Sequence, residues 1–280
     1  GPIGKSGVGY RLTGFSAERD GFTDAVLTGK DLGELDRHGV RAQLQWRPSA
    51  GARWRAIIDH SAEDEDGPAI VLVDPGVLLE DGSIRPNNFL DRTIRAGHVP
   101  QFEPFARRTY IESRNSLKSE QSGISVQGDW SWGAHTLTSI SAWRQWDFEP
   151  HTDGDLTPLS VQPDIGFSVS HRQVSQEVRL SSAASSQFPY VGGVYLYGQR
   201  ITGTFVSLYG PDAADFAVPG LTPAALDGFR VKTVGTPEAE SYAVFGQGTW
   251  RATPRMDITA GLRWTREHKS ADIERTSSGG

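Results

Sequence analysis

The sequence contains no cysteine, and it has no long run of apolar residues. Without cysteine, disulfide bonds and thiolate metal sites are excluded. Without a continuous apolar stretch of about 18 residues, a transmembrane helix is excluded as well. A β-barrel crosses a membrane with short strands of alternating polarity, so the missing apolar run does not exclude a membrane protein.

An excess of positive charge is also missing. The 280 residues hold 28 Lys and Arg against 34 Asp and Glu, which gives a formal net charge of -6. Binding to a nucleic-acid backbone depends on the opposite balance, so we expect no nucleic-acid partner.

Motifs that carry chemistry are scarce. Gly4-Lys5-Ser6 resembles the end of a phosphate-binding loop, but a strand pattern follows where that motif needs a helix. The acidic run at residues 63–66 lacks the alternating pattern of a calcium loop, and we interpret it as a solvated loop. The seven histidines show no metal-ligand spacing. We therefore expect no catalytic residue, no metal site, no cofactor and no enzyme activity.

What the sequence does contain is a period-two alternation of apolar and polar residues. It is clearest near the C-terminus, where five residues of one face are Met256, Ile258, Ala260, Leu262 and Trp264. Successive side chains of a strand point to opposite faces, so this pattern predicts a strand with one apolar face. A similar strand over residues 242–250 precedes it, and the turn at residues 252–255 predicts a hairpin.

The whole chain predicts nine such strands, all-β and antiparallel. Their connections alternate between long and short. The short turns fall at residues 48–51, 132–135, 181–187 and 252–255, and the long loops fall at about 19–38, 62–121, 151–167 and 204–237. We also expect a β-bulge near Ser139 and a helical turn within residues 87–95.

An up-and-down order would place every short turn at one rim and every long loop at the other. Outer-membrane barrels have this arrangement, with short periplasmic turns and long extracellular loops. The tryptophans fit two membrane-interface girdles, because they fall near the turns or near the far ends of the strands. The expected girdle residues are Trp46, Trp54, Trp132, Trp143, Trp146, Trp250 and Trp264. The alternative is a soluble carbohydrate-binding β-sandwich in which these rings fill the core.

Several segments resemble TonB-dependent outer-membrane receptors. VSQEVRL at residues 174–180 is similar to their FSQELRL stretch, and LTSISAWR at residues 137–144 is similar to their LTSITAYR strand. YAVFGQ at residues 242–247, followed by ITAGLRW at residues 258–264, resembles their YALFGQ…LTAGLRYT hairpin. Residues 19–22 and 36–45 resemble the early barrel region of the family.

The resemblance implies a segment of a larger barrel. Barrels of this family have about twenty-two strands, preceded by a plug domain and a short TonB-binding box. We find nine strands and neither of those parts, so residues 1–280 are expected to be part of the barrel domain, without a plug. Nine strands leave two open edges, which hydrocarbon does not tolerate, so the chain is expected to be a segment of a larger barrel or to need a partner that closes it.

The resemblance also implies a function. It suggests energised uptake of a scarce nutrient across the outer membrane of a Gram-negative cell, commonly a ferric siderophore. The implied partners are outer-membrane lipid, the small-molecule nutrient and the TonB-ExbB-ExbD system, which acts through a plug domain outside this chain. A passive outer-membrane channel or a structural barrel protein is the alternative.

Substrate contacts are predicted from residue type, because aromatic rings and guanidinium groups can hold a ferric chelate or a sugar by stacking and charge. The candidates are Phe105, Arg107, Arg108, Tyr110, Tyr195 and Tyr197. The alternative interpretation is that they pack the loops and line the wall.

Overall fold

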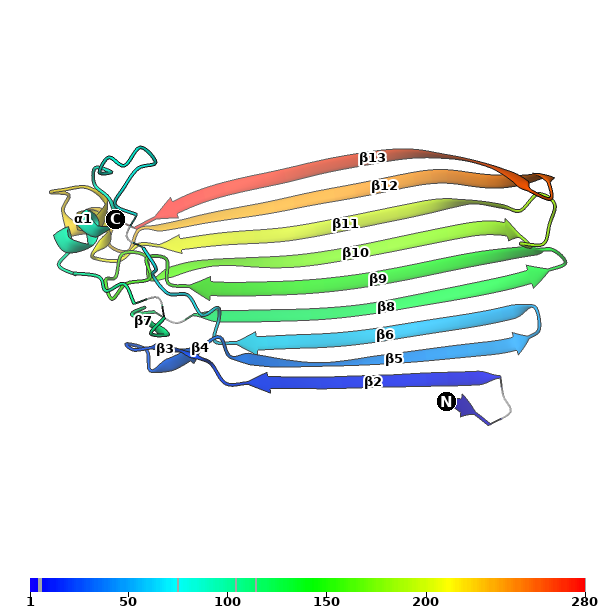
Figure 1. The fold of residues 1–280 in the computed structure, drawn as a ribbon, viewed down its shortest axis with the longest axis horizontal. Coiled ribbons are helices and arrows are strands. Elements are labelled where there is room, and N and C mark those ends of the chain that lie inside the picture. The colour runs from blue at the N-terminus through cyan, green and yellow to red at the C-terminus, as the bar shows by residue number, and fades with distance from the viewer. Residues whose placement is uncertain (5–6, 75, 104, 114, 280) are drawn as a thin grey trace.

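One long antiparallel sheet makes up most of the molecule (Figure 1). The computed structural model describes residues 1–4, 7–74, 76–103, 105–113 and 115–279, so Lys5 and Ser6 of the rejected phosphate-loop motif lie outside the described residues. The strands of this sheet lie side by side in the same order in which they follow one another along the chain. Within the described part of the chain, its ten strands are β1 (Pro2–Ile3), β2 (Val8–Arg19), β5 (Leu35–Ser49), β6 (Ala52–Glu65), β8 (Ser116–Trp132), β9 (His135–Thr152), β10 (Asp164–Ser182), β11 (Tyr190–Leu208), β12 (Arg230–Thr253) and β13 (Met256–Ser278).

The remaining elements gather at one end of this sheet (Figure 1). A second sheet, ordered β4-β3-β7, consists of β3 (Thr23–Ala25), β4 (Lys30–Leu32) and β7 (Arg108–Thr109). The helices are α1 (Phe89–Arg95), α2 (Ala213–Ala217) and a 3₁₀ turn (Pro223–Ala225). Helix α1 confirms the helical turn expected within residues 87–95. None of the helices among the described residues has the length and apolarity to span a membrane.

The nine predicted strands are confirmed as the nine long strands of the sheet, and their connections alternate as predicted. Short turns join β5 to β6, β8 to β9, β10 to β11 and β12 to β13 at one end, while the long connections lie at the other (Figure 1). We refer to these long connections, residues 20–34, 66–115, 153–163 and 209–229, as the loop layer.

Some details of the prediction are wrong. All four long loops are shorter than expected. The difference is largest at residues 204–237, because β11 continues to Leu208 and β12 begins at Arg230. Strands β11 and β12 remain paired there, although apolar and polar residues no longer alternate along them. The bulge expected near Ser139 is absent, since β9 pairs with both β8 and β10 in unbroken register through this residue. Ser139 interrupts the alternation only as a polar side chain on the apolar face, where it receives a hydrogen bond from Gln176 (2.9 Å).

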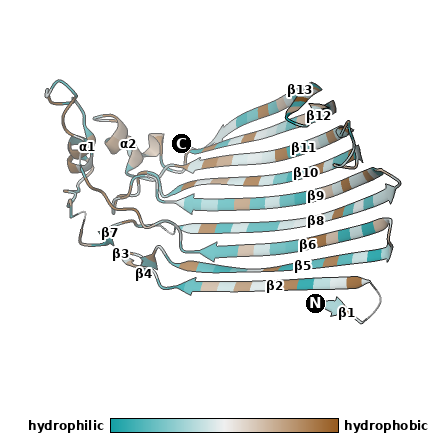
Figure 2. Ribbon diagram, turned by 45° about the vertical axis from the view of Figure 1, so that its right-hand side comes forward, coloured by the Kyte–Doolittle hydropathy of each residue, from teal (hydrophilic) through white to brown (hydrophobic). Residues whose placement is uncertain are grey.

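The register aligns the alternation of all nine strands into two faces. One continuous row shows this, since Leu44 pairs with Ala56, Ala56 with Val126, and Val126 with Ser141. Figure 2 shows the alternating hydrophobic and hydrophilic bands along the strands. The apolar face remains uncovered: Leu12 is 72% exposed and Leu262 82% exposed. A sandwich would bury this face under a second sheet, so the single layer argues against that alternative.

Buried apolar residues concentrate in the loop layer rather than against the long sheet. One cluster contains Ala25, Leu32 and Ile111, with Ala69 and Leu156 packed against it. A second contains Leu159, Val161 and Ala213, with Ala96, Tyr209, Phe216 and Leu226 around it. Each cluster joins segments from different long connections, so the loop layer is a packed structure with its own small cores.

Candidate functional site

Ion pairs cross the strands of the polar face. Asp59 on β6 accepts hydrogen bonds from Arg41 Nη1 on β5 (3.4 Å) and from Arg144 Nη2 on β9 (2.5 Å). Strand β8 runs between Asp59 and Arg144, and the residue that pairs with both is Gly123. A Cβ atom there would lie 2.8 Å from Arg144 Nε and 3.2 Å from Asp59 Oδ2. Gly123 therefore leaves the space in which Asp59 and Arg144 meet across a strand.

A second polar node surrounds Asp129, which is only 9% exposed. Its carboxylate accepts hydrogen bonds from Arg53 Nη2 (2.8 Å), Gln127 Nε2 (3.1 Å) and Thr138 Oγ1 (2.8 Å). Buried carboxylates are stable only when paired and hydrogen-bonded in this way. The side chains in this part of the polar face are therefore hydrogen-bonded to one another and held in place.

An aromatic patch with one guanidinium group occupies the same face. Tyr195 and Tyr197, both predicted substrate contacts, lie stacked on β11 with ring centroids 6.5 Å apart. Arg263 on β13 lies 5.9 Å from the Tyr195 ring and 5.7 Å from the Phe245 ring on β12. Gly193 leaves space for Phe245, because a Cβ atom there would lie 2.9 Å from that ring. We call Tyr195, Tyr197, Phe245 and Arg263 the aromatic patch.

The other four candidates lie in the loop layer, separate from the aromatic patch. Phe105 is 95% exposed, and Arg107 has a left-handed backbone (φ 54°). Arg108 and Tyr110 border a cavity of about 20 Å³, which is about the room for one water molecule. Tyr110 donates to Gln101 Oε1 across 3.3 Å. The six candidates therefore form two groups, because Tyr195 and Tyr197 lie near the short-turn end of β11.

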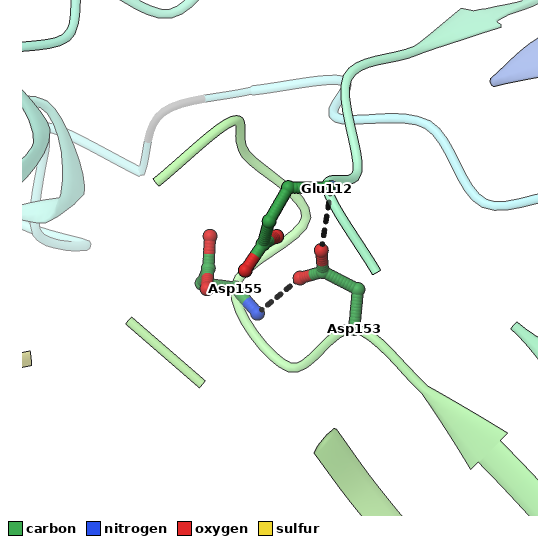
Figure 3. A group of neighbouring side chains, drawn as sticks. All are labelled: Glu112, Asp153 and Asp155. Atoms are coloured by element: carbon green, nitrogen blue, oxygen red, sulfur yellow. Dashed lines mark hydrogen bonds between the residues drawn. The ribbon is translucent and has the colours of Figure 1, made fainter. Parts of the chain in front are cut away.

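Three carboxylates meet inside the loop layer (Figure 3). Glu112 follows β7, while Asp153 and Asp155 follow β9, and one carboxylate oxygen of each lies within 4.8 Å of the others. Asp153 accepts from the backbone N–H groups of Glu112 (3.1 Å), Asp155 (3.0 Å) and Leu156 (2.8 Å). We call Glu112, Asp153 and Asp155 the carboxylate cluster.

Asp155 and Glu112 differ in how their charge is stabilised. Asp155 accepts from the backbone N–H groups of Thr157 (3.1 Å) and Gln162 (3.0 Å), whereas both Glu112 oxygens are shielded from solvent and have no hydrogen-bond partner among the described residues. Burial, reinforced by Asp153, raises the pKa of Glu112 to about 9. Burial also raises the pKa of Asp155, to about 6. This cluster was not identified from the sequence, because its members lie in two separate loops.

The comparison with protein families matches residues 76–279 to the TonB dependent receptor-like, beta-barrel family. The chain belongs to this family. Its members are outer-membrane transport proteins rather than enzymes, so the expected location and the expected lack of enzyme activity agree with the family. Among the curated proteins, none matches the chain.

Solved structures of receptors share the fold. The ferric yersiniabactin uptake receptor FyuA from Yersinia pestis matches 99% of this chain with a TM-score of 0.67 and 16% identity. The ferric-catecholate import receptor Fiu from E. coli K12 in its open form matches 97% with a TM-score of 0.58 and 13% identity. The ferric citrate transporter FecA matches 98% with a TM-score of 0.58 and 11% identity. This receptor segment covers 40%, 42% and 35% of those chains.

The tryptophans of the receptor segment lie in strands, as predicted. Six of the expected girdle residues share the apolar face, namely Trp46, Trp54, Trp132, Trp143, Trp250 and Trp264. Trp146 lies on the polar face, where its Nε1 donates to Ser119 Oγ (3.1 Å). Its place in a lipid-facing girdle was wrongly predicted, because three residues along a strand from Trp143 lead to the opposite face.

Sequence reasoning missed two members of the aromatic patch and the whole carboxylate cluster. Phe245 and Arg263 are cross-strand partners, and Phe245 is also the partner of Gly193 beside Tyr195. The predicted hairpin could have brought Phe245 opposite Arg263, but its position beside Tyr195 depends on the register between β11 and β12. For the carboxylate cluster, the only sequence signal is the pair Asp153 and Asp155 in a polar loop, without a motif that points to Glu112.

Proposed function

We propose that this chain is part of the barrel wall of an outer-membrane receptor that takes up a ferric siderophore in an energised step. The aromatic patch carries this proposal, because it offers flat rings and one guanidinium group on the inner polar face. Rings and guanidinium groups bind planar and anionic ligand groups by stacking and by charge. The names of the similar receptors support the cargo, since FyuA, Fiu and FecA are described as ferric-complex receptors or transporters.

In this proposal the two groups of predicted contact residues act at different depths. Phe105, Arg107, Arg108 and Tyr110 meet the cargo at the loop layer, and Tyr195 and Tyr197 meet it inside the wall. The apolar face contacts outer-membrane lipid, with the six girdle tryptophans at the two interfaces. Energy reaches the barrel from the TonB-ExbB-ExbD system through a plug domain outside this chain.

The test is uptake of iron by cells that depend on the complete gene product. Cells lacking their other receptors would be given ⁵⁵Fe-loaded siderophores of the catecholate, phenolate and citrate classes, with and without a protonophore. We expect accumulation of one class that stops when the protonophore removes the membrane energy. Uptake that continues unchanged would favour a passive channel, and no uptake of any ferric complex would refute the proposed cargo.

The aromatic patch can be tested in the same assay. Replacing Tyr195 and Tyr197 by Ala removes both stacking surfaces, and we expect the half-saturating siderophore concentration to rise about tenfold, which corresponds to about 1.4 kcal/mol. Tyr242→Ala is the matched control, since Tyr242 pairs with Leu196 on the apolar face and cannot contact cargo from there. Equal uptake by the double variant and the control would exclude the aromatic patch as a binding site.

A further inference from the structure

The carboxylate cluster contains a charge that nothing among the described residues balances. Asp153 and Asp155 are held by backbone N–H groups, but both oxygens of Glu112 are buried without a donor. Asn115 lies against the same cluster, where its Oδ1 accepts from Asp153 N (3.0 Å), and its side chain is almost fully buried. Its Nδ2 also has no partner in the described part of the chain, and neither has Ser113 Oγ.

The geometry suits a hard divalent cation. All three possible ligands are oxygen atoms, the class that Ca²⁺ and Mg²⁺ prefer. Two oxygens on opposite sides of a Ca²⁺ ion lie up to about 5 Å apart, and those on a Mg²⁺ ion up to about 4.2 Å. The three carboxylate oxygens lie within 4.8 Å of one another, inside the span of about 5 Å that the opposite ligands of one Ca²⁺ ion reach. In Figure 3 the side chains of Glu112 and Asp155 point into the space that Asp153 borders.

We propose that Glu112, Asp153 and Asp155 bind a calcium ion that fixes the loop layer. The ion joins two connections that are far apart in sequence, because Glu112 precedes β8 and the two aspartates follow β9. Ile111 and Leu156, the neighbours of two ligands, pack in the same apolar cluster with Ala25 and Leu32. Calcium therefore stabilises the junction of three connections, those that follow β2, β6 and β9.

The experiment uses the full chain in detergent micelles after treatment with EDTA. Titration calorimetry with CaCl₂ at pH 7.5 measures the affinity and the number of bound ions. Hydrogen exchange of residues 110–113 and 153–162 is then followed with and without Ca²⁺. We expect one bound ion and at least tenfold slower exchange in both segments.

Glu112→Gln is the decisive variant, because it keeps the size of the side chain and removes its charge. We expect its Ca²⁺ affinity to fall at least tenfold relative to the unchanged chain. Asp64→Asn is the matched control, since Asp64 is an exposed carboxylate in the acidic run at the end of β6, and this variant should bind Ca²⁺ like the unchanged chain. A circular-dichroism spectrum confirms that each variant keeps its strands.

Three results would overturn the proposal. The first is an absence of Ca²⁺ binding by the unchanged chain. The second is equal Ca²⁺ affinity in Glu112→Gln and the unchanged chain. The third is loss of binding in Asp64→Asn alone, which would move the site to the acidic run at residues 63–66.

Discussion

At the scale of single residues, neighbouring positions of one strand require different side chains, because one position faces the apolar side of the sheet and the next faces the polar side. Leu44 belongs to the apolar face and Gln43 to the polar face of β5. We expect Leu44→Arg to destabilise the assembled wall by about 2–4 kcal/mol, since a charge at the depth of the lipid tails is costly. Gln43→Arg should cost less than about 1 kcal/mol. The measurement is urea unfolding in lipid vesicles, and equal tolerance of both variants would refute the lipid-facing assignment.

Gly123 provides a residue-scale test of the polar face. Gly123→Ala should push the Arg144 guanidinium away from Asp59 and reduce stability by about 0.5–1 kcal/mol, the range of a partly exposed ion pair. Gly203→Ala is the control, because a Cβ atom there would come no closer than 3.8 Å to another atom. In an Arg144→Met background the effect of Gly123→Ala should disappear. An effect that persists there would mean that Gly123 serves the backbone and not the ion pair.

At the scale of elements, α1 depends on Asn88, the residue that caps its start. Asn88 is buried, its Oδ1 accepts from Asp91 N (3.0 Å), and its backbone N–H donates to Asp91 Oδ2 (3.3 Å). This reciprocal cap satisfies two of the free groups at a helix start. We expect Asn88→Ala to lower the stability of α1 by about 1 kcal/mol and to speed its hydrogen exchange about fivefold. Asn88→Ser keeps an uncharged acceptor for Asp91 N and should change exchange less, and equal acceleration by both variants would contradict the capping role.

The long strands were predictable from sequence because a membrane forces one face of each to be apolar. Their ends were less predictable. Strand β2 has 12 residues and β12 has 24, whereas about 9–11 residues cross a membrane. Beyond the apolar band, Lys232 and Glu238 keep pairing although the alternation no longer marks the strand.

The candidate site was less predictable than the strands, because it depends on distances between separate segments. Tyr195 and Tyr197 were found by residue type alone. Arg263 completes their patch only through the order β11-β12-β13. Glu112 joins Asp153 only through the packing of two loops, which no local pattern encodes.

At the scale of the whole molecule, the wall has two edges. Within the described residues, β13 pairs only with β12, whereas β10 pairs with β9 and β11. For the 280-residue chain alone in micelles, we expect alternate amides of β13 to exchange at nearly unprotected rates and β10 to be protected at least a thousandfold. Slow exchange along all of β13 in dilute, monomeric protein would contradict an unpaired edge. Mass measurement of the micelle would verify that the protein is monomeric.

The long connection between β6 and β8, residues 66–115, has a consequence for the order of assembly. Hairpins with two-residue turns close in microseconds, but a connection of roughly fifty residues costs about 3 kcal/mol more entropy to close. The connections between β2 and β5 and among β8 to β13 are all shorter than this one. We therefore expect the pairing of β6 with β8 to be the last long-range pairing to form, and the loop layer to complete its packing after it.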